Sequence, residues 1–197
     1  MVVDMVESVR LYEADESSIV ARWRQLVAAV SKKVLPVHGG RLVKSLGDGL
    51  LLEFRDVPRA IAAAFEIQLL LPALNKGCTS EVAMCLRAGL HVADVVVDRT
   101  DIFGAGVNLA ARLASLAGPD QIVVSSDVRE GLTEGLDAEI VDMGECWLKH
   151  LDSPVRAFRL RRPGQLDLVG GPGTGFMPSL RPSLAVLSFS TVGDAGP

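Results

Sequence analysis

The order in which short apolar runs alternate with longer amphipathic stretches is the feature that most restricts the fold of this chain. Residues 1–6, 40–46 and 49–54 have the length and apolar character of strands. Residues 15–34 and 57–74 carry apolar side chains at helical spacing, and the sequence predicts a helix in each. Asp15 is a suitable cap for the first of these helices, and Pro72 should end the second.

The second half of the chain adds further strands and helices. Residues 81–97 predict two strands or one bent strand, and residues 103–118 predict a helix. We then expect a strand at 121–125, a short helix at 126–135, and a hairpin whose two strands lie at 138–151 and 155–161. The resulting order is a ferredoxin-like βαββαβ core with a C-terminal αββ extension. We therefore predict an α+β fold, with a mainly antiparallel sheet and helices packed on one face.

Composition narrows the class of protein. The chain has 197 residues, 49% of them hydrophobic, so we expect a packed core. A net charge of −4 argues against a nucleic-acid partner. The three cysteines are an odd number without metal-ligand spacing, which favours reduced thiols and a cytoplasmic location. We expect no signal peptide and no membrane segment, because the apolar run at 60–71 is short and contains Glu66.

The composition changes near residue 163, which suggests a domain boundary. We expect one folded domain at 1–162 and a Gly/Pro-rich linker at 163–182. Residues 183–197 contain an apolar strand that reads as the start of a truncated second domain. The alternative is that this strand docks on the first domain as an edge strand.

Polar residues stand at the ends of several apolar elements. Asp4 ends the first strand, Asp48 lies in a Gly-Asp-Gly turn and Asp101 precedes a helix. Lys44 interrupts the apolar approach to that turn. Taken singly, each has an ordinary explanation: a turn residue, a helix cap or a lysine at a strand edge.

These stretches together resemble the class III adenylate/guanylate cyclase catalytic domain, in its bacterial, adenylate cyclase-like form. The matching text is "VDMVESVRLYEADE", "HGGRLVKSLGDGLLLEF" and "TDIFGAGVNLAARL", followed by "LAGPDQIVVSSDV" and "LKHLDSPVRAFRL". The resemblance covers residues 1 to about 161, and its motifs occur in the family's order. It implies an adenylate cyclase, a signalling enzyme that converts ATP to 3′,5′-cyclic AMP and pyrophosphate.

The resemblance also implies roles for individual residues. Asp4 and Asp48 match the family's metal ligands, which hold two Mg²⁺ or Mn²⁺ ions per site; carboxylate oxygens suit such hard cations. Lys44 and Asp101 match the base-selecting pair. Lysine can donate to N1 of adenine and aspartate can accept from its N6 amino group, whereas guanine reverses this pattern.

Three more positions match catalytic or substrate-binding residues of the family. Asn108 matches the ribose-orienting asparagine and Arg112 the arginine that stabilises the transition state. The two are spaced i, i+4 and share a helix face. Lys149 matches a triphosphate-binding lysine. In such enzymes two chains share each active site, so the resemblance implies a homodimer in which Lys44 and Asp48 serve different sites.

Two departures from the family pattern keep other functions open. The family has glycine in the phosphate-binding loop and after the triphosphate-binding lysine, where this chain has Glu7 and His150. A glutamate in the phosphate loop adds negative charge where a triphosphate should bind, which puts turnover in question. One alternative is a catalytically weak or inactive cyclase-fold module that dimerises or binds nucleotide to regulate a partner. Another is an unrelated ferredoxin-like interaction domain.

Overall fold

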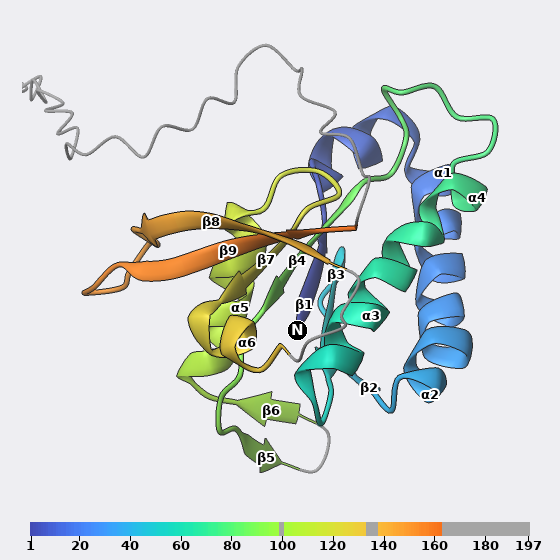
Figure 1. Ribbon diagram of the computed structural model, residues 1–197. Helices are drawn as coiled ribbons and strands as arrows, with labels where there is room; N and C mark the ends of the chain where they lie inside the picture. The colour runs from blue at the N-terminus through green and yellow to red at the C-terminus, as the bar shows by residue number, and fades with distance from the viewer. Residues whose placement is uncertain (99–100, 133–137, 163–197) are drawn as a thin grey trace, which may run out of the picture. The chain divides into compact units, whose positions relative to one another are not determined.

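The computed structural model describes residues 1–98, 101–132 and 138–162 (Figure 1). The predicted linker at 163–182 and the apolar strand at 183–197 lie outside the described residues. All three cysteines are free, as the sequence predicts.

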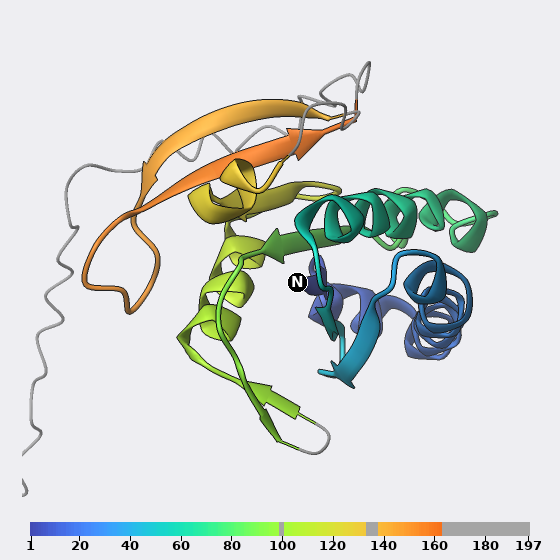
Figure 2. The same ribbon diagram turned by 60° about the horizontal axis from the view of Figure 1, so that its bottom comes forward.

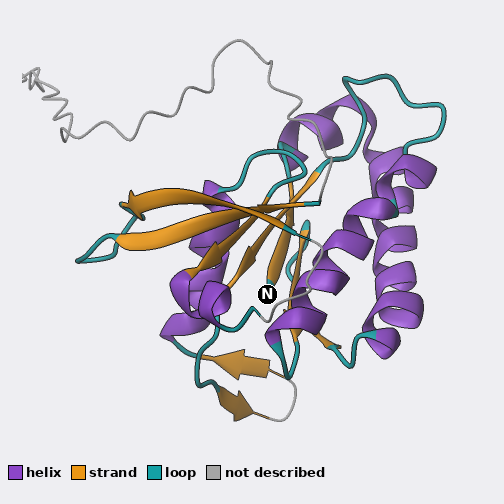
Figure 3. Ribbon diagram, viewed as in Figure 1, coloured by secondary structure: helices purple, strands orange, loops and turns teal. Residues whose placement is uncertain are grey.

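Within the described residues, seven strands form one sheet in the order β2-β3-β1-β4-β7-β9-β8. Figure 3 shows the strands in orange and the helices in purple. The strands are β1 Val2–Met5, β2 Arg41–Ser45, β3 Gly49–Glu53, β4 Leu86–Leu90, β7 Ile122–Ser125, β8 Glu139–Cys146 and β9 Val155–Arg161. Among these neighbours β4 and β7 run parallel, and the other pairs are antiparallel. The predicted α+β class and mainly antiparallel sheet are confirmed.

The helices follow the predicted order. They are α1 Ser8–Ala29, α2 Leu35–Val37, α3 Val57–Leu69, α4 Leu71–Leu74, α5 Ala105–Leu116 and α6 Ser126–Glu130, with a π-helical turn, η1 Val30–Val34, between α1 and α2. α1 begins at Ser8, earlier than the predicted start at Asp15. Asp15 has non-helical dihedral angles, and its carboxylate accepts hydrogen bonds from Ser17 and Ser18. Asp15 thus caps the second half of a kinked helix.

Helices pack on both faces of the sheet, so the prediction of a single covered face is wrong. Alternate residues of each strand point to opposite faces. Val3 and Met5 of β1 belong to the main core with residues of α1 and α3, whereas Val2 packs with Ala110 and Ala114 of α5. Figures 1 and 2 show α5 on the other side of the central strands from α1 and α3.

A glycine allows α5 to lie close to the sheet. A Cβ atom at Gly89 of β4 would collide with the backbone of Ala110 and Ala114. A side chain at this position would therefore push α5 outward, and with it every residue that α5 carries.

A small arm extends the fold beside β2. The antiparallel strands β5 Val96–Asp98 and β6 Asp101–Phe103 pair with each other, and β6 lies against β2. The contact between β6 and β2 places the segment that contains Asp101 beside the segment that contains Lys44.

One apolar stretch among the described residues, 57–74, could cross a membrane by length and composition alone. It comprises α3 and α4, and residues such as Ile61 and Ile67 are buried in the main core. A core helix passes the same test, so this stretch is weak support for a membrane span.

Candidate active site

The two predicted metal ligands lie side by side on neighbouring segments. Asp4 of β1 is directly opposite Gly49 of β3, and the backbone N–H of Met5 donates to the carbonyl of Asp48 over 3.0 Å. Both aspartates line a cavity of about 180 Å³, whose wall includes residues of α5. The fold therefore brings together two carboxylates that are 44 positions apart (48 − 4) in the sequence.

Sequence reasoning missed a third member of this group, Arg87 of β4. Its Nε and Nη2 atoms lie 2.8 and 2.6 Å from Oδ2 of Asp4. A charged residue in the apolar run "MCLRAGL" was the available signal, but the partner of Arg87 depends on which strand lies beside β4. Asp4 and Arg87 are paired directly across the antiparallel β1 and β4 strands.

The donor set fits a divalent cation. Oδ2 of Asp4 is held by Arg87, whereas Oδ1 faces Gly49, where an added Cβ would lie 3.7 Å from it. Asp48 adds a second carboxylate at the same cavity. Among the described residues no group of three or more His, Cys, Asp or Glu side chains could hold a metal. Further oxygen ligands would come from backbone carbonyls, substrate or water.

The predicted base-selecting pair also meets in space. Nζ of Lys44 on β2 donates to Oδ2 of Asp101 on β6 over 2.6 Å. The Lys44 ammonium also lies 5.7 Å from the ring centre of Phe103, and Oδ1 of Asp101 accepts from the backbone N–H of Ile102. The hydrogen bond from Lys44 is the main reason why the pKa of Asp101 is lowered.

Helix α5 carries two of the predicted site residues, Asn108 and Arg112. Asn108 is exposed and Arg112 is half-buried, one helical turn apart. Within the described part of the chain, the Nε of Arg112 is buried without a hydrogen-bond partner. An unpaired buried donor of this kind is costly in free energy, but because the chain itself covers the atom, it does not by itself mark a ligand site.

Lys149 is the predicted site residue that the structure ties least to the others. It lies with His150 in the loop between β8 and β9, and both side chains are exposed. No contact found in the described residues joins Lys149 to Asp4, Asp48 or Arg112. Its role stays a prediction.

The two departures from the family pattern share one backbone property. Glu7 and His150 have φ angles of 51° and 60°, in the left-handed region that glycine adopts most readily. The Glu7 carboxylate accepts a hydrogen bond from Arg10 over 2.7 Å, and Arg10 also donates to the carbonyl of Glu81. The extra negative charge of Glu7 is thus paired with the positive charge of Arg10 at the surface.

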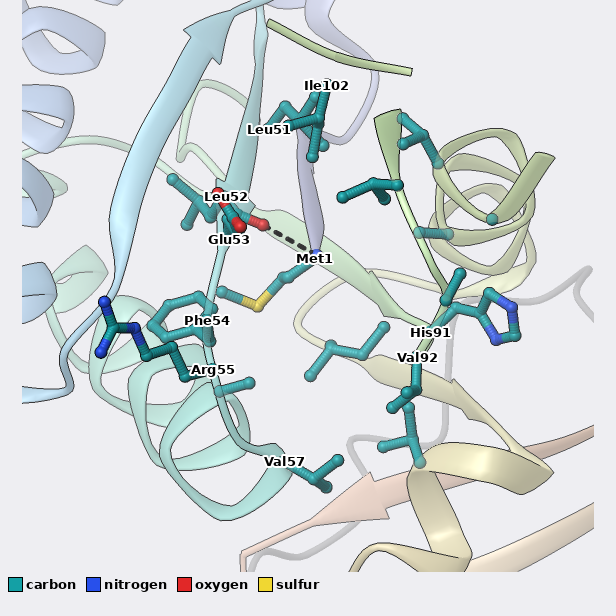
Figure 4. A pocket seen from close by; sticks show the side chains of 18 of the residues that line it. Met1, Leu51, Leu52, Glu53, Phe54, Arg55, Val57, His91, Val92 and Ile102 are labelled. Atoms are coloured by element: carbon teal, nitrogen blue, oxygen red, sulfur yellow. Dashed lines mark hydrogen bonds between the residues drawn. The ribbon is translucent and has the colours of Figure 1, made fainter. Parts of the chain in front are cut away.

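A larger cavity lies elsewhere and is mostly apolar. It has a volume of about 280 Å³ and is lined by the end of β3, the start of α3, the segment after β4 and part of α5 (Figure 4). None of the predicted site residues lines it. The smaller cavity, which is lined by two carboxylates, is the one with metal-binding chemistry.

His91 lies at the edge of the larger cavity. Its Nδ1 atom is 2.8 Å from the Ser125 hydroxyl, and burial lowers the pKa of the His91 imidazole.

Comparison with known proteins decides the family. Residues 1–160 match the model of the adenylate and guanylate cyclase catalytic domain. The chain belongs to this family. The third function considered from the sequence, an unrelated interaction domain, is thereby excluded.

Relatives and solved structures agree with this assignment. The chain is 32% identical over 202 aligned positions to putative adenylate cyclase 3 of Rhizobium meliloti, covering 98% of this chain and 33% of that protein. It is 33% identical over 135 positions to an adenylate cyclase of Streptomyces coelicolor, covering 68% of this chain and 34% of the relative. The chain thus spans about a third of the length of these curated relatives.

Among solved structures, an adenylate/guanylate cyclase/hydrolase from Silicibacter pomeroyi superposes with a TM-score of 0.71 at 26% identity, over 82% of this chain and 95% of that one. An adenylate cyclase from Trypanosoma brucei, described in its monomeric state, has the same TM-score at 19% identity, over 84% and 90% of the two chains. This second likeness supports the fold alone.

Proposed function

We propose that the cyclase domain converts ATP to 3′,5′-cyclic AMP and pyrophosphate, at sites shared between two copies of the chain in a homodimer. The observation that carries the choice of ATP is the 2.6 Å contact between Lys44 and Asp101. These residues are 57 positions apart, and their contact supports a shared role in which Lys44 would donate to N1 of adenine and Asp101 would accept from its N6 amino group.

Two Mg²⁺ or Mn²⁺ ions held by Asp4 and Asp48 would lower the pKa of the ribose 3′-hydroxyl and neutralise the triphosphate. Asn108 would orient the ribose, and Lys149 would bind the triphosphate. The guanidinium of Arg112, whose buried Nε has no partner in the described chain, would stabilise the charge that develops on the α-phosphate.

The arrangement of the single chain favours a shared site. The cavity with Asp4 and Asp48 is lined by Ala111 and Ser115 of α5, and neither Asn108 nor Arg112 lines it. The Lys44–Asp101 pair likewise lies outside that cavity. A second copy of the chain would supply the groups that this half-site lacks.

A cyclic-nucleotide assay with Mn²⁺ tests the proposal, with ATP and GTP as separate substrates. We expect cyclic AMP as the main product and no product from Asp48→Ala, which is the matched inactive control. Equal or faster turnover of GTP would contradict the assignment of Lys44 and Asp101.

The second candidate is a nucleotide-binding regulatory module without turnover, which the negative charge of Glu7 favours. The Glu7–Arg10 ion pair weakens that argument because it offsets the charge. Binding of ATP without formation of cyclic AMP, in protein that forms dimers, would favour this module over the enzyme.

A further inference from the structure

His91 contacts three parts of the fold that lie far apart in the sequence. It follows β4 directly, and its Nδ1 atom lies 2.8 Å from the hydroxyl of Ser125 on β7 and 3.3 Å from Oδ2 of Asp127 in the first turn of α6. The imidazole also packs against α5, because a Cβ at Gly106 would lie 3.2 Å from Cδ2 of His91. Only 12% of the His91 side chain is exposed, so the ring cannot move far without changing these contacts.

The first half of α5 depends on this contact because it borders a cavity. Val107 and Ala110 line the cavity of about 280 Å³, and so does His91 (Figure 4). A void supplies no partner atoms, so the packing of these turns comes from their other sides. The same helix carries Asn108 and Arg112. A shift of the first turn of α5 would therefore move both of these side chains.

The two partners of His91 favour different protonation states. The Ser125 hydroxyl can donate to Nδ1 of a neutral imidazole, whereas the Asp127 carboxylate only accepts and therefore favours a protonated Nδ1. The pKa of His91 is lowered mainly by burial; the charge of Asp127 raises it and the buried ammonium of Met1 lowers it. The imidazole is thus mainly neutral at neutral pH and takes up a proton in acidic solution.

A positive charge on His91 is unfavourable beside α5. The N-terminal end of a helix carries a partial positive charge, and Gly106 is the second residue of α5. Asp127, in contrast, attracts the protonated ring towards α6. Among the described residues, the other charged side chains in the lining of the cavity are Glu53, Arg55 and Asp56. They belong to the wall formed by β3 and the start of α3. Protonation should therefore draw the ring from α5 towards α6.

We propose that His91 is a positioning residue whose neutral imidazole holds the first turn of α5 in place, and that uptake of a proton releases this turn. The inference goes beyond the proposed function but rests on it in one respect, because its effect on catalysis acts through Asn108 and Arg112. Production of cyclic AMP should fall when His91 is protonated. Since Arg112 would act on the transition state, the loss should affect kcat more than the KM for ATP.

The experiment measures the protonation of His91 in the whole chain by NMR titration, and kcat for cyclic AMP production over the same pH range. At the pH where His91 is half protonated, wild-type kcat should be about half of its plateau value. His91→Gln cannot take up the proton and should keep its plateau value there. Asp127→Asn removes the group that favours the protonated ring, so the fall in activity should move to lower pH. His38→Gln is the matched control: His38 also contacts a carboxylate, that of Glu66, and its loss should leave the pH profile unchanged.

A second measurement does not depend on activity. Hydrogen–deuterium exchange of the peptide that covers residues 105–112 is compared between wild type and His91→Gln at each pH, which cancels the ordinary pH dependence of exchange. We expect faster exchange in wild type below the pH where His91 is half protonated, and equal exchange at higher pH. Thermal unfolding identifies a variant that fails to fold. Asp127→Asn changes a half-exposed side chain and keeps His91, so it tests the protonation step if His91→Gln does not fold.

Each failure has its own signature. If His91→Gln and Asp127→Asn keep the wild-type pH profile, and exchange in α5 does not follow the titration, the inference is wrong and the proposed function stands. If exchange follows the titration but kcat does not, the link from His91 to Asn108 and Arg112 is overturned. If wild type forms no cyclic AMP at any pH, the proposed function is wrong, and the catalytic part of the inference fails with it.

Discussion

Lys44 and Asp48 lie four positions apart in one hairpin, yet their side chains belong to different groups. Lys44 contacts Asp101 on β6, whereas Asp48 lines a cavity with Asp4 of β1. One short segment thus contributes to two separate clusters. The shared dimeric site that we propose would account for this division, because each cluster would then complete the other in the partner chain.

The first prediction tests that division by complementation. Asp48→Ala should be inactive because a metal ligand is lost, and Arg112→Ala should lose about 10²–10³ in rate. Co-expressed with different affinity tags, the two variants should form mixed dimers with about half of wild-type activity, because one of the two sites is intact. The assay is cyclic AMP production by dimers purified through both tags. Isolated mixed dimers that remain inactive would show that the site is not shared in this way.

The second prediction concerns the Lys44–Asp101 pair and its pH dependence. The hydrogen bond from Lys44 lowers the pKa of Asp101, so the aspartate stays ionised and the ion pair stays intact at pH values somewhat below those at which an ordinary carboxyl group protonates. The pair is lost as pH falls through the lowered value. Lys44→Met should raise the pKa of Asp101, as measured by carboxyl NMR titration. The same variant should leave the pKa of Asp142 unchanged, since Arg156 is what lowers that value.

Lys44→Met should also reduce discrimination between ATP and GTP. Loss of one partner in a purine-selecting pair costs roughly 1–3 kcal/mol, or about 5- to 150-fold in relative kcat/KM. Steady-state kinetics with both nucleotides measure this ratio. Unchanged selectivity would place base recognition elsewhere.

A third prediction follows from the left-handed backbone of Glu7. Glu7→Gly should stabilise the fold by about 1 kcal/mol, since glycine adopts positive φ without a Cβ clash. The exposed Glu7–Arg10 pair that is lost contributes little stability. His150→Gly is the matched control for the backbone effect and should raise the melting temperature in a similar way.

Glu7→Gly should differ from His150→Gly in its effect on the kinetics with ATP. It removes a negative charge from the expected phosphate loop and frees Arg10, so it should lower the KM for ATP or raise activity. Kinetics of both variants against wild type make the comparison. If Glu7→Gly changes stability alone, the carboxylate does not act on the triphosphate.

A fourth prediction tests how α5 is held. Gly89→Ala should destabilise the domain by at least about 1–3 kcal/mol, because the new methyl group meets the backbone of α5. Activity should fall further than stability alone explains, since α5 carries Asn108 and Arg112. Gly118→Ala is the control: its Cβ would meet only the end of the flexible Gln121 side chain. Thermal unfolding and cyclic AMP assays on both variants, below their melting temperatures, separate the two effects.

The sequence by itself determined the order of elements, the Gly-Asp turn and the positions that match the cyclase family. These features depend on residues only a few positions apart. The spacing of hydrophobic residues selects helix or strand, and Asp15 caps a helix because its carboxylate accepts a hydrogen bond from the backbone N–H of Ser18. The motifs also predicted that Lys44 and Asp101 act together, although 57 positions separate them.

Only the tertiary structure decided the contacts that depend on strand order and on the face each helix covers. Arg87 meets Asp4 because β4 lies beside β1 in a particular register, and no local pattern specifies that register. The placement of α5 on the face opposite α1 and α3 depends on its close approach to the sheet at Gly89. The sequence predicted that the first helix starts at Asp15, whereas in the structure α1 starts directly after the left-handed residue Glu7. Such features result from packing between segments that are distant in the chain, so they emerge when the sheet is assembled.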